Sequence, residues 1–172
     1  KAMRVSKIID ELKNSFGIDM SSFAVITLHR PSNVDDISVL TRIVKALEVI
    51  SRDMPVIFPV HPRTMKNIYV TDAGKRLAKN KNICIIEPLG YFDFITLMSS
   101  AKIVLTDSGG IQEETTILKV PCITLRENTE RPVTVEIGSN KIVGTKTENI
   151  LDAYRNIRGG KWRKPQIPPL WD

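Results

Sequence analysis

Two apolar patterns alternate along this chain. In the first, apolar residues recur at every third or fourth position, which is the spacing of one helix face. The clearest case is formed by Val5, Ile8, Ile9, Leu12 and Phe16. In the second pattern apolar residues follow one another almost without a break, as in FAVITL at 23–28. Runs of this kind are typical of strands that are buried on both faces.

The two patterns predict an ordered series of elements. Helices are expected at 5–16, 37–50, 64–80 (a weaker pattern), 91–100, from 110 onward and at 148–157, and strands at 23–28, 55–60, 83–86, 103–106, 121–125 and 141–144. Asp35 or Asp36 is placed to cap the second helix, whose apolar face starts at Ile37. The tail from Arg158 to Asp172, rich in Gly, Pro and Trp, is expected to form an irregular strap.

Alternation of buried strands with helices makes the strands parallel. The sequence therefore predicts an α/β fold: one doubly wound, Rossmann-like parallel sheet of five or six strands, with helices on both faces, in a single domain over residues 1–172.

Composition excludes other classes of protein. A hydrophobic share of 42% with 26% charged residues is that of a globular chain rather than a disordered one. The relation between surface area and mass implies that folding of a chain this size buries about 70% of the surface that the unfolded chain exposes, which is enough for one hydrophobic core. No apolar run approaches the roughly 18–20 residues of a membrane span, and the first residues carry no secretory h-region. We expect a cytoplasmic protein with no membrane partner.

The net charge and the two cysteines indicate little about the chemistry of the protein. The net charge is +6, from 25 Lys+Arg and 19 Asp+Glu, and five of the positive charges lie within 155–164. Such a run attracts phosphates or is simply a solvated surface. Cys84 and Cys122 lie in apolar segments without the spacing of a zinc site, and both are expected to be buried, reduced thiols in strands. His61 suits a metal, but without clustered carboxylates no metal site is predicted.

Polar and charged side chains follow the ends of the predicted strands. In an open parallel sheet, ligands bind at the carboxyl ends of the strands. Both histidines of the chain and a tandem glycine pair come directly after strands, as do several arginines. These residues are His29, Arg30, His61, Gly109, Gly110 and Arg131. We expect them to share one edge of the sheet and to form the binding site.

The Ser-Gly-Gly turn (Ser108–Gly110) is the strongest local signal for a phosphate. Gly109 and Gly110 let the backbone approach a ligand closely, and the helix that follows offers unpaired N–H groups. Ser108 adds a hydroxyl donor, and Glu113 or Glu114 lies where a carboxylate can accept from ribose hydroxyls. The alternative is a plain strand-to-helix turn capped by Asp107 or Ser108. Dinucleotide, P-loop and hydrolase-elbow motifs are absent from the sequence.

Other residues of this edge suit an anion and a flat ring. His29 and Arg30 combine a group that titrates near neutral pH with a permanent charge. Leu89 and Phe94 form an apolar slot for a base, or alternatively one side of a helix that packs on the core.

Five segments, in this order, carry a resemblance: HRPSNVDD, FPVHPRT, EPLGYFDF, TDSGGIQEE and NTERPVTVEIGSNKIVGT. The chain from about residue 20 to its end resembles the second domain of the non-hydrolysing UDP-N-acetylglucosamine 2-epimerases, which have the two-domain GT-B fold. The resemblance implies interconversion of UDP-N-acetylglucosamine and UDP-N-acetylmannosamine, by elimination and re-addition of UDP, on the way to surface polysaccharides. It implies no metal and no nicotinamide cofactor.

The resemblance also implies roles for single residues. Ser108, Gly109 and Gly110 would hold the diphosphate, and Glu114 would hold the ribose. Leu89 and Phe94 would border the uracil. Arg131 would lie near the sugar-phosphate, and His29 would assist the departure of UDP.

Arg30 and His61 would correspond to a regulatory substrate site of bacterial members. Near both of them the sequence departs from the commoner family pattern. Ser32 stands where many members have Glu, and His61 is followed by Pro-Arg-Thr rather than by x-Asn-Pro.

Family members are about twice as long as this chain. We therefore expect a C-terminal UDP-binding domain that lacks the first domain, its acid/base carboxylates and a final crossover helix. Alone it should be inactive, and the full-length enzyme should be a homodimer. The alternatives are the nucleotide-binding half of a GT-B glycosyltransferase and a non-catalytic binding module. The latter includes a nucleic-acid binder acting through Lys161–Lys164, although no nucleic-acid partner is expected.

Overall fold

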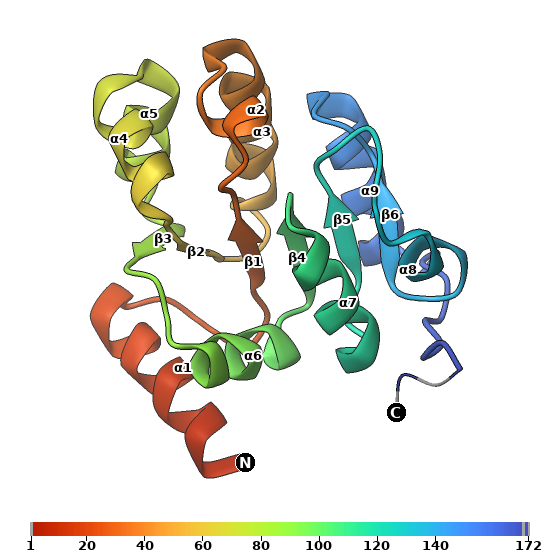
Figure 1. The fold of residues 1–172 in the computed structure, drawn as a ribbon. Helices are drawn as coiled ribbons and strands as arrows, with labels where there is room; N and C mark the ends of the chain where they lie inside the picture. The colour runs from red at the N-terminus through yellow and green to blue at the C-terminus, as the bar shows by residue number, and fades with distance from the viewer. Residues whose placement is uncertain (1, 170, 172) are drawn as a thin grey trace.

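The computed structural model describes residues 2–169 and 171 and shows one six-stranded parallel sheet between two layers of helices (Figure 1). The strands are β1 (Ala24–Thr27), β2 (Val56–Pro59), β3 (Ile83–Ile86), β4 (Ile103–Thr106), β5 (Cys122–Thr124) and β6 (Asn140–Ile142). The helices are α1 (Ala2–Phe16), α2 (Pro31–Val34), α3 (Ile37–Ile50), α4 (Pro62–Val70), α5 (Asp72–Lys79), α6 (Tyr91–Ser100), α7 (Gly109–Leu118), α8 (Pro132–Glu136) and α9 (Thr147–Arg158).

The strand order is β3-β2-β1-β4-β5-β6, with every neighbouring pair parallel. This is the order of a Rossmann sheet, and the predicted fold class is confirmed. The chain leaves β1 toward β2 on one side and later returns to place β4 on the other side. The order of strands therefore reverses between β1 and β4, which is where such sheets form a crevice at their carboxyl ends.

The two faces of the sheet are covered by different helices. On β1, Ala24 and Ile26 join the core beneath α3 and α9, whereas Val25 joins the core beneath α1 and α6. This alternation is the period of two that a strand imposes. Figure 1 shows α1 and α6 side by side at one face. Cys84 and Cys122 are buried in β3 and β5, as predicted.

Helix capping and exposure refine the sequence prediction. Asp36, not Asp35, caps α3, because its side chain accepts hydrogen bonds from the N–H groups of Ser38 and Val39. Ile37 stands at the first helical position and is exposed rather than part of the apolar face. In α1, Leu12 is buried but Phe16 is 37% exposed, and the side chain of Val5 lies outside the described part.

The sequence patterns missed one helix break and two short helices. The stretch expected as one helix at 64–80 is two helices, α4 and α5, because Thr71 turns the chain and caps α5. The helices α2 and α8 are four and five residues long, too short to show a helical period. Each begins with a proline, which is the one local signal that could have located them.

The tail forms the predicted strap as far as it is described, since residues 170 and 172 lie outside the described part. The Trp162 indole donates to the Ser139 carbonyl, and the Arg163 guanidinium donates to carbonyls of Val135, Glu136 and Gly138. These contacts fasten the tail to the α8–β6 connection. None of the described helices has the length and the apolar character that crossing a bilayer would need.

Gly74 gives a test of the packing of α4 on α5. A Cβ added there would lie 2.3 Å from the Ile68 Cα and 2.7 Å from the Asn67 carbonyl oxygen. Gly74→Ala should therefore lower the free energy of unfolding by about 1–3 kcal/mol, although alanine favours a helix. Urea denaturation measures this loss. Lys75→Ala, on the exposed side of the same helix, should stay within about 0.5 kcal/mol of the unmodified chain, and equal stabilities for both variants would contradict the packing.

Candidate functional site

The crevice between β1 and β4 is built around the carboxylate of Asp107. This residue follows β4 directly and is completely buried. Its two oxygens accept from the backbone N–H of His29 at 3.2 and 3.1 Å and from the N–H of Arg30 at 3.0 Å. Asn33 donates its side-chain amide to the same carboxylate at 3.3 Å. Asp107 thus fastens the loop after β1 to the end of β4.

Further hydrogen bonds extend this connection across the sheet. The hydroxyls of Thr27 and Thr106 lie 2.7 Å apart across the β1–β4 pair. Asn33 also donates to the carbonyl of Leu125 at the end of β5, at 2.9 Å. Thr64, fully buried at the start of α4, donates to the Leu28 carbonyl at 2.7 Å. The carboxyl ends of several strands are therefore held in one hydrogen-bonded network.

His29 is positioned by the same carboxylate. Its Nδ1 lies 2.9 Å from Asp107 Oδ1. This hydrogen bond raises the pKa of His29, while partial burial and the charge of Arg30 work in the opposite direction. The His29 ring centroid is 6.1 Å from that of His61 and the ring planes are tilted by 48°, so the two histidines are neighbours in the lining of one pocket.

A pocket of about 230 Å³ opens beside these rings. Five residues predicted from the sequence line it: His29, His61, Leu89, Phe94 and Ser108. Its other walls are largely apolar and include Ile111 and Pro59. The structure therefore brings two histidines, the apolar slot and the first residue of the Ser-Gly-Gly turn into one site.

The Ser-Gly-Gly turn opens α7, and among the described side chains none is found to cap that helix. Ser108 is the N-cap residue, but its hydroxyl does not bond the first turn. The capping role considered for Asp107 is wrong, because its carboxylate is directed to the loop after β1. The first N–H groups of α7 are thus available to an acceptor other than a capping side chain, and an anion is the acceptor that a helix N-terminus favours.

The loop after β5 brings further charge to this turn. Glu130 accepts from Arg126 at 2.6 and 2.7 Å and lies 3.5 Å from Arg30. The hydrogen bond from Arg126 is the main cause that lowers the pKa of Glu130 to about 2. A Cβ at Gly109 would stand 3.7 Å from Glu130, so the loop passes close to the turn.

Arg131 lies on the same edge but outside the small pocket. Its Nε is 3.0 Å from Glu113 on α7, and its side chain is about half exposed. Thr129 holds this loop against α7, because its hydroxyl donates to Gln112 at 2.6 Å and accepts from the Arg131 N–H at 2.9 Å. The predicted gathering of His29, the glycine pair and Arg131 on one edge is what the structure shows.

Glu114 differs from the other site residues. Its carboxyl is half-buried and one of its oxygens, Oε2, is buried without a hydrogen-bond partner among the described residues. Burial raises the pKa of Glu114, while a hydrogen bond from Tyr91 works against that shift. The predicted role of Glu114 stays a prediction.

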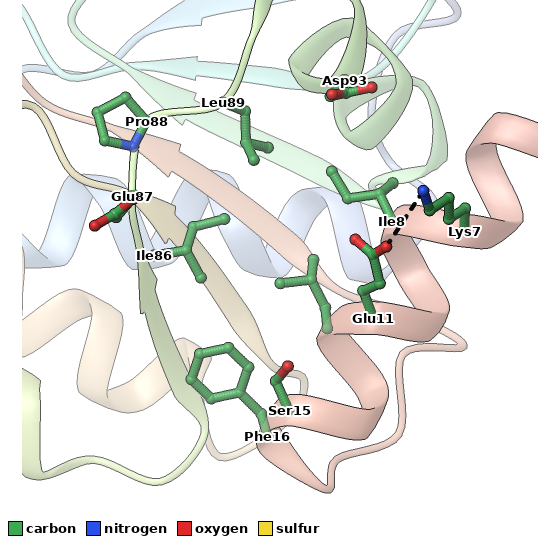
Figure 2. A pocket seen from close by; sticks show the side chains of 11 residues that line it. Lys7, Ile8, Glu11, Ser15, Phe16, Ile86, Glu87, Pro88, Leu89 and Asp93 are labelled. Carbon is green, nitrogen blue, oxygen red and sulfur yellow. Dashed lines mark ion pairs between the residues drawn. The ribbon is translucent and has the colours of Figure 1, made fainter.

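A second, larger cavity adjoins the pocket of the β1–β4 crevice (Figure 2). It has a volume of about 640 Å³ and lies between α1 and the chain that runs from β3 into α6. Figure 2 shows Ile8, Ile86 and Leu89 pointing into it, with Lys7 and Glu11 paired at its rim at 3.8 Å. Only Pro88 and Leu89 belong to both cavities. Size alone would select this cavity, but both histidines and the first residue of the Ser-Gly-Gly turn line the smaller one.

Asp107 and Asn33 organise the candidate site, and sequence reasoning did not select them for it. Both lie within the motifs that carry the resemblance, in TDSGG and HRPSN. What the sequence could not give is the strand order that makes β1 and β4 neighbours, and with it the contact between the two segments.

Comparisons with known proteins give the family of this chain. Residues 2–168 match the sequence profile of the family described as UDP-N-acetylglucosamine 2-epimerase. The chain is 47% identical over 156 residues to the UDP-N-acetylglucosamine 2-epimerase of Methanocaldococcus jannaschii, an alignment that covers 88% of this chain and 42% of that protein. A UDP-2,3-diacetamido-2,3-dideoxy-D-glucuronate 2-epimerase of Pseudomonas aeruginosa is 39% identical over 138 residues, covering 80% of this chain and 37% of that protein.

Solved structures give the same result. The crystal structure of the M. jannaschii UDP-GlcNAc 2-epimerase in complex with UDP-GlcNAc and UDP matches with a TM-score of 0.79 and 42% identity, over 95% of this chain and 47% of that one. The chain thus spans less than half the length of these relatives. Its fold corresponds to one half of a GT-B epimerase. On the profile match and these relatives together, the chain belongs to the UDP-N-acetylglucosamine 2-epimerase family.

Proposed function

We propose that this chain is the UDP-binding half of an enzyme that interconverts UDP-N-acetylglucosamine and UDP-N-acetylmannosamine. The observation that carries the proposal is the crevice between β1 and β4. There Asp107 holds His29 beside an uncapped helix N-terminus that opens with Ser-Gly-Gly. The family and the related complex with UDP-GlcNAc and UDP support the choice of ligand.

The proposed pose places the diphosphate on the Ser-Gly-Gly turn. Backbone N–H groups and the partial positive charge of α7 would bind its oxygens, and the Ser108 hydroxyl would add a donor. The uracil would occupy the slot between Leu89 and Phe94, which line the same pocket as Ser108. Arg131 would approach the sugar-phosphate while remaining near Glu113.

The proposed reaction is an elimination followed by an addition. The C2 proton passes to a base, the C1–O bond breaks with its electrons leaving on UDP, and the sugar becomes unsaturated between C1 and C2. UDP then returns to C1 while a proton is delivered to the opposite face of C2. Negative charge develops on the departing diphosphate, where His29, Arg131 and the helix N–H groups would stabilise it. The base and acid for C2 would belong to the half of the enzyme outside this chain.

Regulation, assembly and location stay predictions. Arg30 already donates its Nε to the Asp107 carbonyl at 2.9 Å, and His61 lies beside His29, so both proposed regulatory residues adjoin the proposed substrate site. A homodimer of the complete enzyme, its N-terminal half as partner and a cytoplasmic location are proposed from the family resemblance.

Binding of UDP to the 172-residue chain tests the pocket. Isothermal titration should show an interaction that weakens about 3–10-fold in Ser108→Ala, which loses one hydrogen bond. Arg131→Ala should weaken it by about 10-fold or more, because a charge-assisted contact is lost. Arg155→Ala removes an equal charge from α9 and serves as the control with unchanged affinity. Unchanged affinity in both site variants would remove these residues from the pocket.

Turnover assays test which half of the enzyme carries the catalytic base. The chain alone should produce no UDP-N-acetylmannosamine from UDP-N-acetylglucosamine and no deuterium at C2 in D₂O, as followed by ¹H NMR. A complete protein containing this chain should do both. Epimerisation by the isolated chain would show that the base lies here. UDP release by the complete protein only with an added acceptor would indicate a glycosyltransferase instead.

The sugar is tested by competition in the complete protein. The P. aeruginosa relative is named for a 2,3-diacetamido-uronate, which shares UDP and a 2-acetamido group with UDP-N-acetylglucosamine. If the proposal is right, UDP-N-acetylglucosamine is the substrate that turns over with the higher kcat/KM. A preference for the diacetamido-uronate would contradict the proposed substrate while leaving UDP binding by this half intact.

A further inference from the structure

The Asp107 carboxylate is surrounded by donors that all come from the segment after β1. Oδ1 accepts from the His29 N–H and from His29 Nδ1, and Oδ2 accepts from the N–H groups of His29 and Arg30 and from the amide of Asn33. Both oxygens are therefore acceptors at once. A side-chain amide in the same place would present an NH₂ group at one of the two positions and could not accept there.

This arrangement decides which nitrogen of His29 carries a proton. Because Nδ1 faces Asp107 Oδ1 at 2.9 Å, Nδ1 must be the donor. No hydrogen bond to the other ring nitrogen, Nε2, is found among the side chains that the structure describes, and the ring lines the pocket beside Ser108. The proton on Nδ1 and the direction of Nε2 are thus fixed by one buried side chain.

Charged and titratable groups around the ring come from three places. Asp107 approaches from the end of β4, Arg30 follows His29 on its own loop, and His61 lies beside it on the loop after β2. Arg30 disfavours a protonated ring, and Asp107 favours one more strongly through its hydrogen bond. Without Asp107, the balance would turn toward a neutral imidazole.

We propose that Asp107 is a positioning residue for His29: it holds the ring in the Nδ1–H form and presents Nε2 to the diphosphate of the ligand. When the ring is protonated, Nε2 is a donor to an oxygen whose negative charge grows as UDP departs. The identity of the ligand in this inference rests on the proposed function, whereas the geometry of Asp107 and His29 is independent of it. Experiments can therefore refute the proposed function and the positioning role separately.

Asp107→Asn is the sharpest variant. The amide keeps the shape of the side chain but has one acceptor and one donor. With its oxygen kept toward the Arg30 N–H and the Asn33 amide, its NH₂ group faces His29 Nδ1. The ring should then become neutral with its proton on Nε2. Asn33→Ala is the matched control, since it removes a bond to Asp107 without changing what faces the ring.

The tautomer is read from the ¹⁵N shifts of the imidazole in the labelled chain, with His61→Gln used to assign the two histidines. The unmodified chain and Asn33→Ala should show Nδ1–H when neutral, and Asp107→Asn should show Nε2–H. An Nε2–H tautomer in the unmodified chain would overturn the proposal. Because this measurement needs no variant at Asp107, it tests the proposal even if Asp107→Asn does not fold. An unchanged tautomer in folded Asp107→Asn would also overturn it.

UDP affinity as a function of pH is the second readout. In the unmodified chain affinity should fall as pH rises through the raised pKa of His29. In Asp107→Asn the fall should occur at lower pH, with affinity at pH 7 reduced by about 10-fold for one lost charge-assisted bond. Equal pH profiles of UDP affinity in the unmodified chain and in Asp107→Asn would overturn the proposed effect of Asp107 on ligand binding. An Nδ1–H ring in a chain that does not bind UDP would refute the proposed function and support the positioning geometry.

Stability against pH tests the same pair without any ligand. The folded-state pKa of His29 is raised, so the stabilising contribution of the pair is complete below the unfolded pKa of about 6.5 and is lost as pH rises through the folded value. The difference in free energy of unfolding between the unmodified chain and His29→Gln should therefore shrink with rising pH. A difference that is constant or grows with pH would contradict the pairing.

Discussion

A buried carboxylate without partners would cost the folded protein several kcal/mol. Asp107 avoids that cost by accepting hydrogen bonds from the segment that follows β1, and the rest of the site depends on this solution. The contact lies where the strand order reverses, so it closes the gap that a doubly wound sheet leaves at its carboxyl edge. It also sets the position of the residue that comes next, Ser108, and with it the start of α7. One side chain therefore relates a titratable ring to an uncapped helix N-terminus.

The charges around this contact alternate, and this changes how an anion would be bound. Arg30 lies against Glu130, which also accepts from Arg126, and Arg131 lies against Glu113. Each of these arginines already has a carboxylate partner in the structure, so a bound diphosphate would share the charge of the arginine with that partner. Backbone N–H groups, the Ser108 hydroxyl and His29 would bind the diphosphate beside them. Such donors are preorganised and cost little rearrangement when charge develops on a leaving group.

The sequence predicted the scaffold well because its signals are local. Long periodic helices and uninterrupted apolar strands such as ICII at 83–86 gave element type and order, and the position of strand ends placed the candidate residues on one edge. Short elements were missed because a helix of four residues, such as α2, shows no period. The role of Asp107 was missed for a different reason: its partners lie more than 70 positions earlier in the chain, and only the pairing of β1 with β4 brings them together.

A crystal structure of the chain with UDP tests most directly whether the crevice organised by Asp107 binds a diphosphate. We expect diphosphate oxygens within about 3.2 Å of the backbone N–H groups of Gly109 and Gly110 and of His29 Nε2. His29 Nδ1 should keep its hydrogen bond to Asp107. UDP bound instead in the cavity beside α1, or in the crevice with its diphosphate turned away from the Ser-Gly-Gly turn, would contradict this binding mode.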